Sequence, residues 1–127
     1  MPMKKILIVE DHPGLRRVLR AQLEWLGFAV IVANNGKEGI DVAIAEKPDL
    51  ILMNTMMPEM DGSQATRTLR TNAGTKDIPI LAVTGMFRPD DLQSSIEAGC
   101  NDYIVKPFSV EELQKKVSAL IQQKIQL

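Results

Sequence analysis

The feature that most constrains the fold is the alternation of short apolar runs with longer amphipathic stretches along the whole chain. The apolar runs cover residues 6–9, 29–33, 50–53, 78–83 and 103–105. Their apolar character is continuous, which is typical of strands that are covered on both faces. Strands that alternate with helices in this way favour a parallel sheet between two helical layers. The pattern therefore predicts an α/β fold.

The stretches between the runs carry helix signals. The first shows apolar residues at helical spacing before Gly27, namely Leu15, Val18, Leu19, Leu23 and Leu26. Asn35 is expected to cap a second helix that reaches about Ala45 and ends before Lys47-Pro48. A third helix is expected from Asp61-Gly62 towards Leu69.

Two further helices are expected in the last third of the chain. Pro89-Asp90-Asp91 places a proline and two carboxylates in a first helical turn, where free N–H groups and the helix dipole favour them, and this helix should end near Gly99. Ser109 and Glu112 form a capping-box pattern. The apolar stripe of the last helix comprises Val110, Leu113, Val117, Leu120 and Ile121.

Composition bounds the class of protein. The 127 residues are 45% hydrophobic and 24% charged, which predicts a single domain over residues 1–127, and we expect no attached output domain. The net charge is −1 and no basic run could follow a phosphate backbone, so direct nucleic-acid binding is not expected. The single Cys100 cannot form an internal disulfide, no signal peptide is recognisable, and no run could span a membrane, so a cytoplasmic location is expected.

Polar side chains stand where four of the runs end. Because the carboxyl ends of parallel strands meet at one edge of the sheet, these side chains should face a common crevice. Adjacent carboxylates beside a third oxygen ligand suit Mg²⁺, and a hydroxyl with an ammonium group suits the oxygens of a phosphoryl group. The residues are Glu10, Asp11, Asn54, Thr84 and Lys106-Pro107.

At these residues the sequence resembles the response regulator receiver family over essentially the whole chain. The resemblance rests on the order and spacing of five segments, which are residues 6–11 (ILIVED), 48–53 (PDLILM), 57–62 (MPEMDG), 83–85 (VTG) and 98–108 (AGCNDYIVKPF). It implies a doubly wound (βα)₅ flavodoxin-like fold with a parallel five-stranded sheet of order 2-1-3-4-5. It also implies a bacterial-type two-component phosphorelay, with a histidine kinase or histidine phosphotransfer protein as partner.

The resemblance also implies roles for individual residues. Glu10 and Asp11 would hold Mg²⁺ together with Asn54 and the backbone carbonyl of Met56. Thr84 and Lys106 would contact the phosphoryl group, and the Lys106-Pro107 bond would be cis. Tyr103, with Thr84, would act as a conformational switch. It would report to a downstream protein on the surface of the fourth helix, fifth strand and fifth helix.

Asn54 departs from the family pattern, which has a phosphoryl-accepting aspartate there. An amide oxygen is neutral and poorly nucleophilic, so Asn54 should not be phosphorylated and the receiver's phosphotransfer chemistry should be lost. The missing anion also predicts weaker Mg²⁺ binding, since a charge pair about 4 Å apart is worth on the order of 4 kcal/mol at an effective dielectric near 20. Less repulsion among carboxylates predicts a more stable metal-free fold than the Asn54→Asp variant would have.

Three functions are weighed against one another. The first is a phosphoryl-acceptor switch whose aspartate is replaced, and the second is a phosphate-independent pseudo-receiver that acts as a protein-interaction module. A flavin carrier or small enzyme on the same fold is disfavoured, because acidic Glu10-Asp11 stands where an anion would have to bind.

Several motifs also have plain structural interpretations. Packing is favoured over a Cu(I) site for Met53, Met56, Met57 and Met60, and over a redox role for Cys100. His12 is interpreted as a solvated loop residue and left outside the metal site. Taken singly, Glu10-Asp11 could belong to a helix start, Thr84 and Lys106 to a strand end and a turn, and Tyr103 to a strand.

Overall fold

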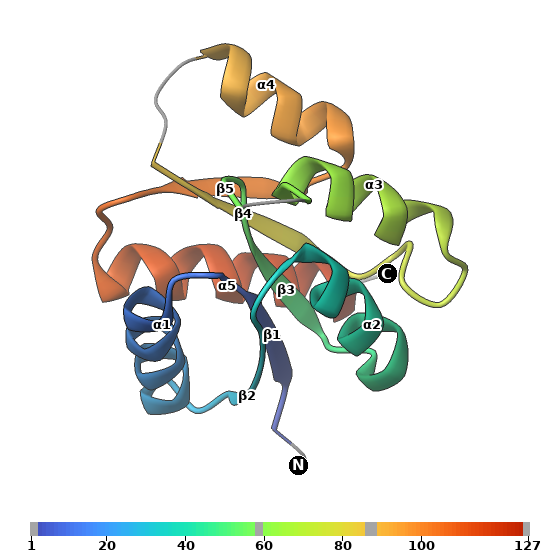
Figure 1. Ribbon diagram of the computed structural model, residues 1–127. Helices are drawn as coiled ribbons and strands as arrows, with labels where there is room; N and C mark the ends of the chain where they lie inside the picture. Colours follow the sequence, from blue (N-terminus) through green and yellow to red (C-terminus); the bar gives the residue numbers. More distant parts are fainter. Residues whose placement is uncertain (1–2, 58–59, 86–88, 126–127) are drawn as a thin grey trace.

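The computed structural model describes residues 3–57, 60–85 and 89–125, and these alternate between strand and helix throughout (Figure 1). The strands are β1 (Lys5–Val9), β2 (Ala29–Ala33), β3 (Leu50–Asn54), β4 (Ile80–Thr84) and β5 (Asp102–Val105). The helices are α1 (Pro13–Trp25), α2 (Gly36–Glu46), α3 (Gly62–Thr71), α4 (Pro89–Ala98) and α5 (Val110–Ile125). Pro58 and Glu59, which belong to the 57–62 motif, and the side chains of Asp90 and Asp91 lie outside the description.

The five strands form one parallel sheet in the order β2-β1-β3-β4-β5, so the expected doubly wound fold is confirmed. The register keeps the strand ends level, because Val9 pairs with Met53, and Asn54 pairs with Val83. Strand β4 begins at Ile80, two residues later than the apolar run suggested. Proline has no backbone N–H to offer a ladder, and Pro79 only accepts a hydrogen bond from the Ile51 N–H, at 3.0 Å.

Helices cover both faces of the sheet, with α1 and α5 on one side and α2 and α3 on the other (Figure 1). Alternate residues of each central strand enter opposite cores, as the two-residue period of a strand requires. On β3, for example, Leu50 and Leu52 face α1 and α5, whereas Ile51 and Met53 face α2 and α3. Continuous apolar runs are therefore needed because both faces are buried. No helix within the described residues is long and apolar enough to cross a membrane.

The expected apolar stripe of α1 needs one correction, at Val18. Leu19 and Leu23 are fully buried, but Val18 is 52% exposed. Successive helical residues are separated by about 100° around the axis, so the side chain before Leu19 points away from the core. Val18 is thus an apolar residue presented at the surface.

Side-chain caps fix the helix starts. The Asn35 side chain accepts a 2.8 Å hydrogen bond from the Glu38 N–H, as expected, and Ser109 Oγ accepts one from the Glu112 N–H at 3.1 Å. At α3 the Asp61 carboxylate accepts from the Gln64 N–H at 2.8 Å, and the Gln64 side chain accepts from the Asp61 N–H at 3.2 Å. This helix start was expected from the sequence, but its reciprocal capping box was not.

Gly62 is the point where α3 meets the end of β3, which leads to a prediction about stability. An added Cβ would lie 2.9 Å from Thr55 Cα and would collide with the Asn54 carbonyl oxygen, and both are backbone atoms. Gly62→Ala should therefore lower the free energy of unfolding by about 2 kcal/mol in urea denaturation.

Gly85→Ala is the matched control, since a Cβ at Gly85 would meet no atom within 4 Å. It should change the free energy of unfolding by less than about 0.5 kcal/mol. Equal losses in the two variants would contradict the role assigned to the close approach at Gly62.

Candidate functional site

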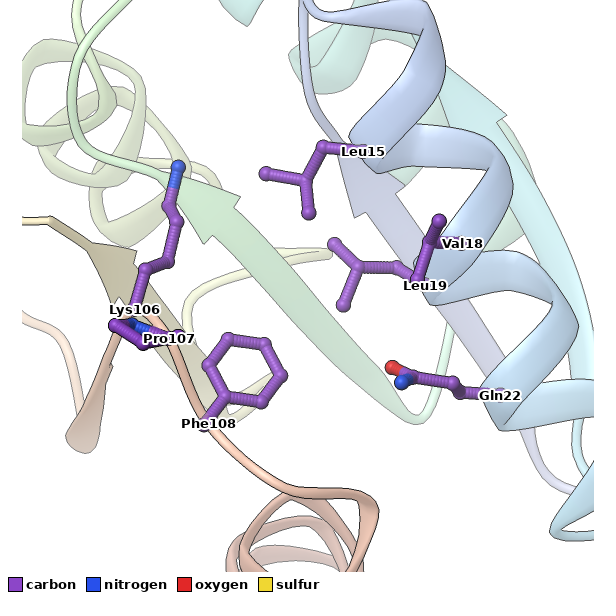
Figure 2. Close-up of a pocket in the computed structure, with 7 residues that line it drawn as sticks. All are labelled: Leu15, Val18, Leu19, Gln22, Lys106, Pro107 and Phe108. Atoms are coloured by element: carbon purple, nitrogen blue, oxygen red, sulfur yellow. The ribbon is translucent and has the colours of Figure 1, made fainter.

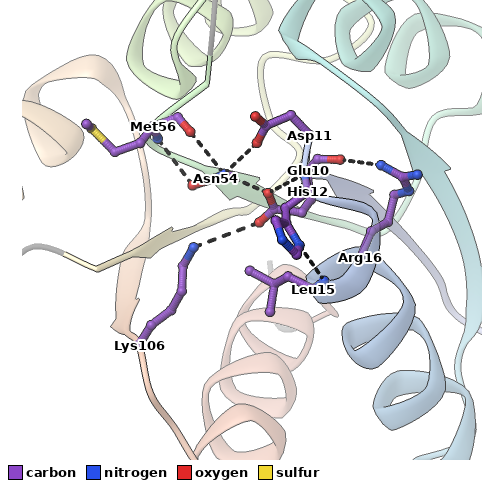
Figure 3. Close-up of polar contacts among 8 residues, drawn as sticks. All are labelled: Glu10, Asp11, His12, Leu15, Arg16, Asn54, Met56 and Lys106. Atoms are coloured by element: carbon purple, nitrogen blue, oxygen red, sulfur yellow. Dashed lines mark hydrogen bonds and ion pairs between the residues drawn. The ribbon is translucent and has the colours of Figure 1, made fainter.

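The polar strand ends meet at the carboxyl edge of the sheet (Figure 3). Glu10 and Asp11 follow β1, Asn54 ends β3, and Lys106 follows β5. Because β3 pairs with β1 on one side and with β4 on the other, Asn54 lies at the centre of this edge. The expected convergence of these residues is present.

Glu10 is the most deeply buried charged group of the site, with 1% of its surface exposed. Its Oε2 accepts hydrogen bonds from Asn54 Nδ2 at 2.8 Å and from the His12 N–H at 3.1 Å. Its Oε1 accepts no hydrogen bond from the described residues but lies 3.9 Å from Lys106 Nζ. Burial raises the pKa of the Glu10 carboxyl, and the His12 N–H and Lys106 ammonium oppose that shift.

Asn54 is 5% exposed, and its amide group connects three surrounding groups. Its Nδ2 lies 2.8 Å from Glu10 Oε2, 3.2 Å from Asp11 Oδ1 and 3.1 Å from the Met56 carbonyl oxygen. Its Oδ1 accepts a hydrogen bond from the Met56 N–H at 3.2 Å. The Met56 N–H can only donate, so it fixes which end of the amide faces the carboxylates.

These contacts test whether the residues fit a metal ion. Two carboxylates and a backbone carbonyl converge on Asn54 Nδ2. Oxygen ligands of this kind suit a hard cation such as Mg²⁺. Within the described part of the chain, no group of three or more histidine, cysteine, aspartate and glutamate side chains is placed to hold a metal ion. The two carboxylates and the Met56 carbonyl fit Mg²⁺ when water molecules complete its coordination. The Asn54 amide group lies between these three ligands.

Lys106 and Thr84 lie on the β4 and β5 side of the site. The Lys106 N–H donates to the Thr84 carbonyl at 2.7 Å, which ties the two strand ends together. The Lys106–Pro107 peptide bond is cis, as expected. Thr84 is buried and lines a polar cavity of about 180 Å³ together with Thr55, Met56, Asp61, Ser63, Ser94 and Ser95.

Tyr103 lies on β5 and packs against the core beneath α2 and α3. Lys116 Nζ on α5 lies 5.6 Å from the centre of its ring and forms a 3.0 Å ion pair with Asp102. This contact is not apparent from the sequence, because Lys116 follows Tyr103 by 13 positions and only the packing of α5 brings them together. Tyr103 is therefore in contact with both the core and α5.

The four methionines between residues 53 and 60 do not gather into a site. Met53 and Met57 belong to the core and Met60 packs against it, whereas Met56 is 60% exposed. Cys100 is buried, its Sγ lies 3.8 Å from Thr66 Oγ1, and burial raises the pKa of its thiol. The packing interpretation is supported for Cys100 and for Met53, Met57 and Met60, but not for Met56.

His12 is not simply a solvated loop residue. Its Nδ1 accepts a hydrogen bond from the Leu15 N–H at 3.1 Å and caps α1, because the first N–H groups of a helix need acceptors from outside it. Its side chain is not among the groups that contact Asn54 Nδ2. The general preference of helix starts for a capping acceptor is the signal that could have identified this role.

An apolar groove opens beside the polar site (Figure 2). It has a volume of about 430 Å³ and is lined by Leu15, Val18, Leu19, Gln22, Lys106, Pro107 and Phe108. One wall is α1 and the other is the segment between β5 and α5. Lys106 belongs to both the groove and the polar site, so the two are continuous.

The chain matches known proteins over nearly its full length. The model of the response regulator receiver domain matches residues 6–118. A probable transcriptional regulator, ycf27 of Cyanophora paradoxa, is 36% identical over 93% of this chain and 48% of its own length. The response regulator MprA of Mycolicibacterium vanbaalenii is 36% identical over 95% of this chain and 51% of its own length. The chain thus spans about half the length of these curated relatives.

A solved structure agrees with the sequence match. The receiver domain of the sensor histidine kinase PA1611 from Pseudomonas aeruginosa, solved with a magnesium ion coordinated in its active-site cleft, is 35% identical. It superimposes with a TM-score of 0.90 and covers 95% of this chain and 99% of its own. Fold, strand-edge site and relatives agree, and the chain therefore belongs to the response regulator receiver domain family of two-component signalling.

Proposed function

We propose that this receiver carries Asn54 at the phospho-acceptor position and is not phosphorylated there. The observation that carries the proposal is the place of Asn54, which ends the central strand β3 with its side chain against Glu10, Asp11 and the Met56 carbonyl. Transfer of a phosphoryl group to this position needs an anionic oxygen that attacks phosphorus, and a neutral amide does not supply one. In this form the site performs no phosphotransfer.

The other site residues keep the roles that a receiver needs. Lys106 would contact the phosphoryl oxygens through its ammonium group, and Thr84 through its hydroxyl. Glu10, Asp11, the Met56 carbonyl and Asn54 would hold Mg²⁺, and the bound ion would neutralise negative charge on the phosphoryl group. Mg²⁺ affinity would be weakened, because Asn54 brings no charge to the ion.

Two protein surfaces are proposed. A histidine kinase or histidine phosphotransfer protein would dock on the groove between α1 and the β5–α5 segment, since the groove reaches Lys106 and exposes apolar Val18. A downstream protein would bind the face formed by α4, β5 and α5, with Tyr103 and Thr84 as the switch residues. We propose no direct contact between these residues and nucleic acid, and a cytoplasmic setting.

A phosphate-independent pseudo-receiver is the alternative function. The hydrogen bonds of Asn54 favour it, because they satisfy the Asn54 amide and one oxygen each of Glu10 and Asp11 without an ion or a phosphoryl group. Such a module would bind its partner constitutively, and its affinity would be indifferent to Mg²⁺, to a phosphodonor and to Asn54→Asp.

Asn54→Asp should restore labelling by acetyl phosphate in the presence of Mg²⁺. The new carboxylate oxygen would form a bond to phosphorus while the bond from phosphorus to the acetate oxygen breaks, and acetate leaves. Intact-protein mass spectrometry should detect the acyl phosphate in the variant and no adduct in the unchanged chain. A variant that folds and binds Mg²⁺ but takes no label would overturn the proposed phospho-acceptor position.

The same substitution should change metal binding and stability in opposite directions. With a third carboxylate beside Glu10 and Asp11, the variant should bind Mg²⁺ at least about 10-fold more tightly than the unchanged chain in calorimetric titration. In EDTA the variant should melt at a lower temperature than the unchanged chain, because like charges then repel without an ion between them. Equal affinities and equal melting temperatures would contradict the charge argument.

In the Asn54→Asp variant, docking of a protein phosphodonor at the groove can be tested separately from the phosphorylation reaction itself. Val18→Glu should slow phosphoryl transfer from a protein phosphodonor by about 10-fold and leave labelling by acetyl phosphate unchanged, since it places a charge on an apolar docking surface. Ile44→Glu is a matched control, because Ile44 is an exposed apolar residue on α2, away from the groove. Equal effects of the two substitutions on transfer would argue against docking at the groove.

A further inference from the structure

The Asn54 amide nitrogen lies where the other three proposed metal ligands, Glu10, Asp11 and the Met56 carbonyl, converge. We infer that the Asn54 NH₂ group is the resident occupant of the cation position, and that Mg²⁺ enters only when the amide turns over about its Cβ–Cγ bond. The inference rests on the proposed function in taking Glu10, Asp11 and the Met56 carbonyl as the metal ligands. It adds that the Asn54 amide competes with the ion for these three ligands.

The contacts around Asn54 Nδ2 resemble those of a small cation. The nitrogen carries two hydrogen atoms and has three acceptors at 2.8, 3.2 and 3.1 Å, so at least one hydrogen is shared between two oxygens. Two of these acceptors are carboxylates, and hydrogen bonds to ionised groups are the stronger kind. The amide thus supplies partial positive charge at the place where a metal ion would supply full charge.

The opposite end of the amide locks this orientation. Oδ1 accepts from the Met56 N–H at 3.2 Å. If the amide were inverted, Oδ1 would face two carboxylates and a carbonyl, and the NH₂ group would face another N–H donor. All four contacts would then be repulsive, so the metal-free protein holds one orientation.

A bound cation reverses these preferences. Asn54 can offer a metal ion only its Oδ1, which now points towards the Met56 N–H. Turning Oδ1 towards the ion gives up all four hydrogen bonds of the side chain. Metal binding is then opposed by a defined structural cost in addition to the missing negative charge.

Asn54→Ala separates this inference from the charge argument, because alanine and asparagine are both neutral. Removal of the amide should strengthen Mg²⁺ binding about 5-fold in calorimetric titration, since the ion then displaces only water. If asparagine were an ordinary neutral ligand without a competing role, alanine would weaken binding. Equal or weaker affinity of Asn54→Ala would therefore overturn the inference.

A second test uses the unchanged chain and therefore does not depend on whether a variant folds. In NMR spectra recorded in EDTA, the Asn54 side-chain NH₂ protons should exchange with water at least about 10-fold more slowly than those of Asn34. Asn34 is the control because its amide also donates to a carboxylate, that of Glu38 at 3.2 Å, but at an exposed position. Saturating Mg²⁺ should abolish the difference. Exchange of Asn54 at the rate of Asn34 in EDTA, or persistent protection at saturating Mg²⁺, would overturn the inference.

The outcomes also separate this inference from the proposed function. If neither the unchanged chain, Asn54→Ala nor Asn54→Asp binds Mg²⁺, the proposed metal site fails, and slow exchange in EDTA still decides whether the amide is held. If Asn54→Asp accepts phosphate and Asn54→Ala binds Mg²⁺ no more tightly than the unchanged chain, the proposed function stands and the inference fails.

Discussion

The pairing of β1 with β3 is the constraint on which the rest of the structure depends. Both strands are buried on both faces, and their register sets Val9 opposite Met53. The next residues along, Glu10 and Asn54, are thereby brought within 2.8 Å although they are 44 positions apart in sequence. If one strand shifted by one residue in this pairing, its side chains would turn to the opposite core. The packing of two apolar cores therefore specifies the geometry of a polar site.

Compensation of buried charge governs that site. The Glu10 carboxylate is almost completely removed from water, and removal from water raises its pKa. Three neighbours offset the cost of burial, namely the His12 N–H, the Asn54 amide and, at longer range, the Lys106 ammonium. A receiver with an aspartate at position 54 would add a negative charge here and depend more on a cation. With Asn54, the chain satisfies most of the site from its own atoms.

The sequence predicted periodic and local features well and missed those that depend on how helices pack. Alternating runs located the strands, and the polar residues at their ends located the site. Val18 belongs to the apolar residues at helical spacing but is 52% exposed, because spacing alone does not say how wide the buried face of α1 is. The contact of Lys116 with Tyr103 arises only from the docking of α5 against β5. The groove beside Lys106 likewise needs α1 and the β5–α5 segment in place.

The sequence by itself determined the α/β class, the polar residues at the strand ends and the neutral amide at position 54, because these follow from residue chemistry and chain periodicity. Only the tertiary structure decided which groups the Asn54 amide contacts. An amide has a donor end and an acceptor end of nearly the same shape, and sequence does not say which end faces the carboxylates. That choice is made by the Met56 N–H on one side and by Glu10 and Asp11 on the other, and the two carboxylates reach Asn54 only through strand pairing.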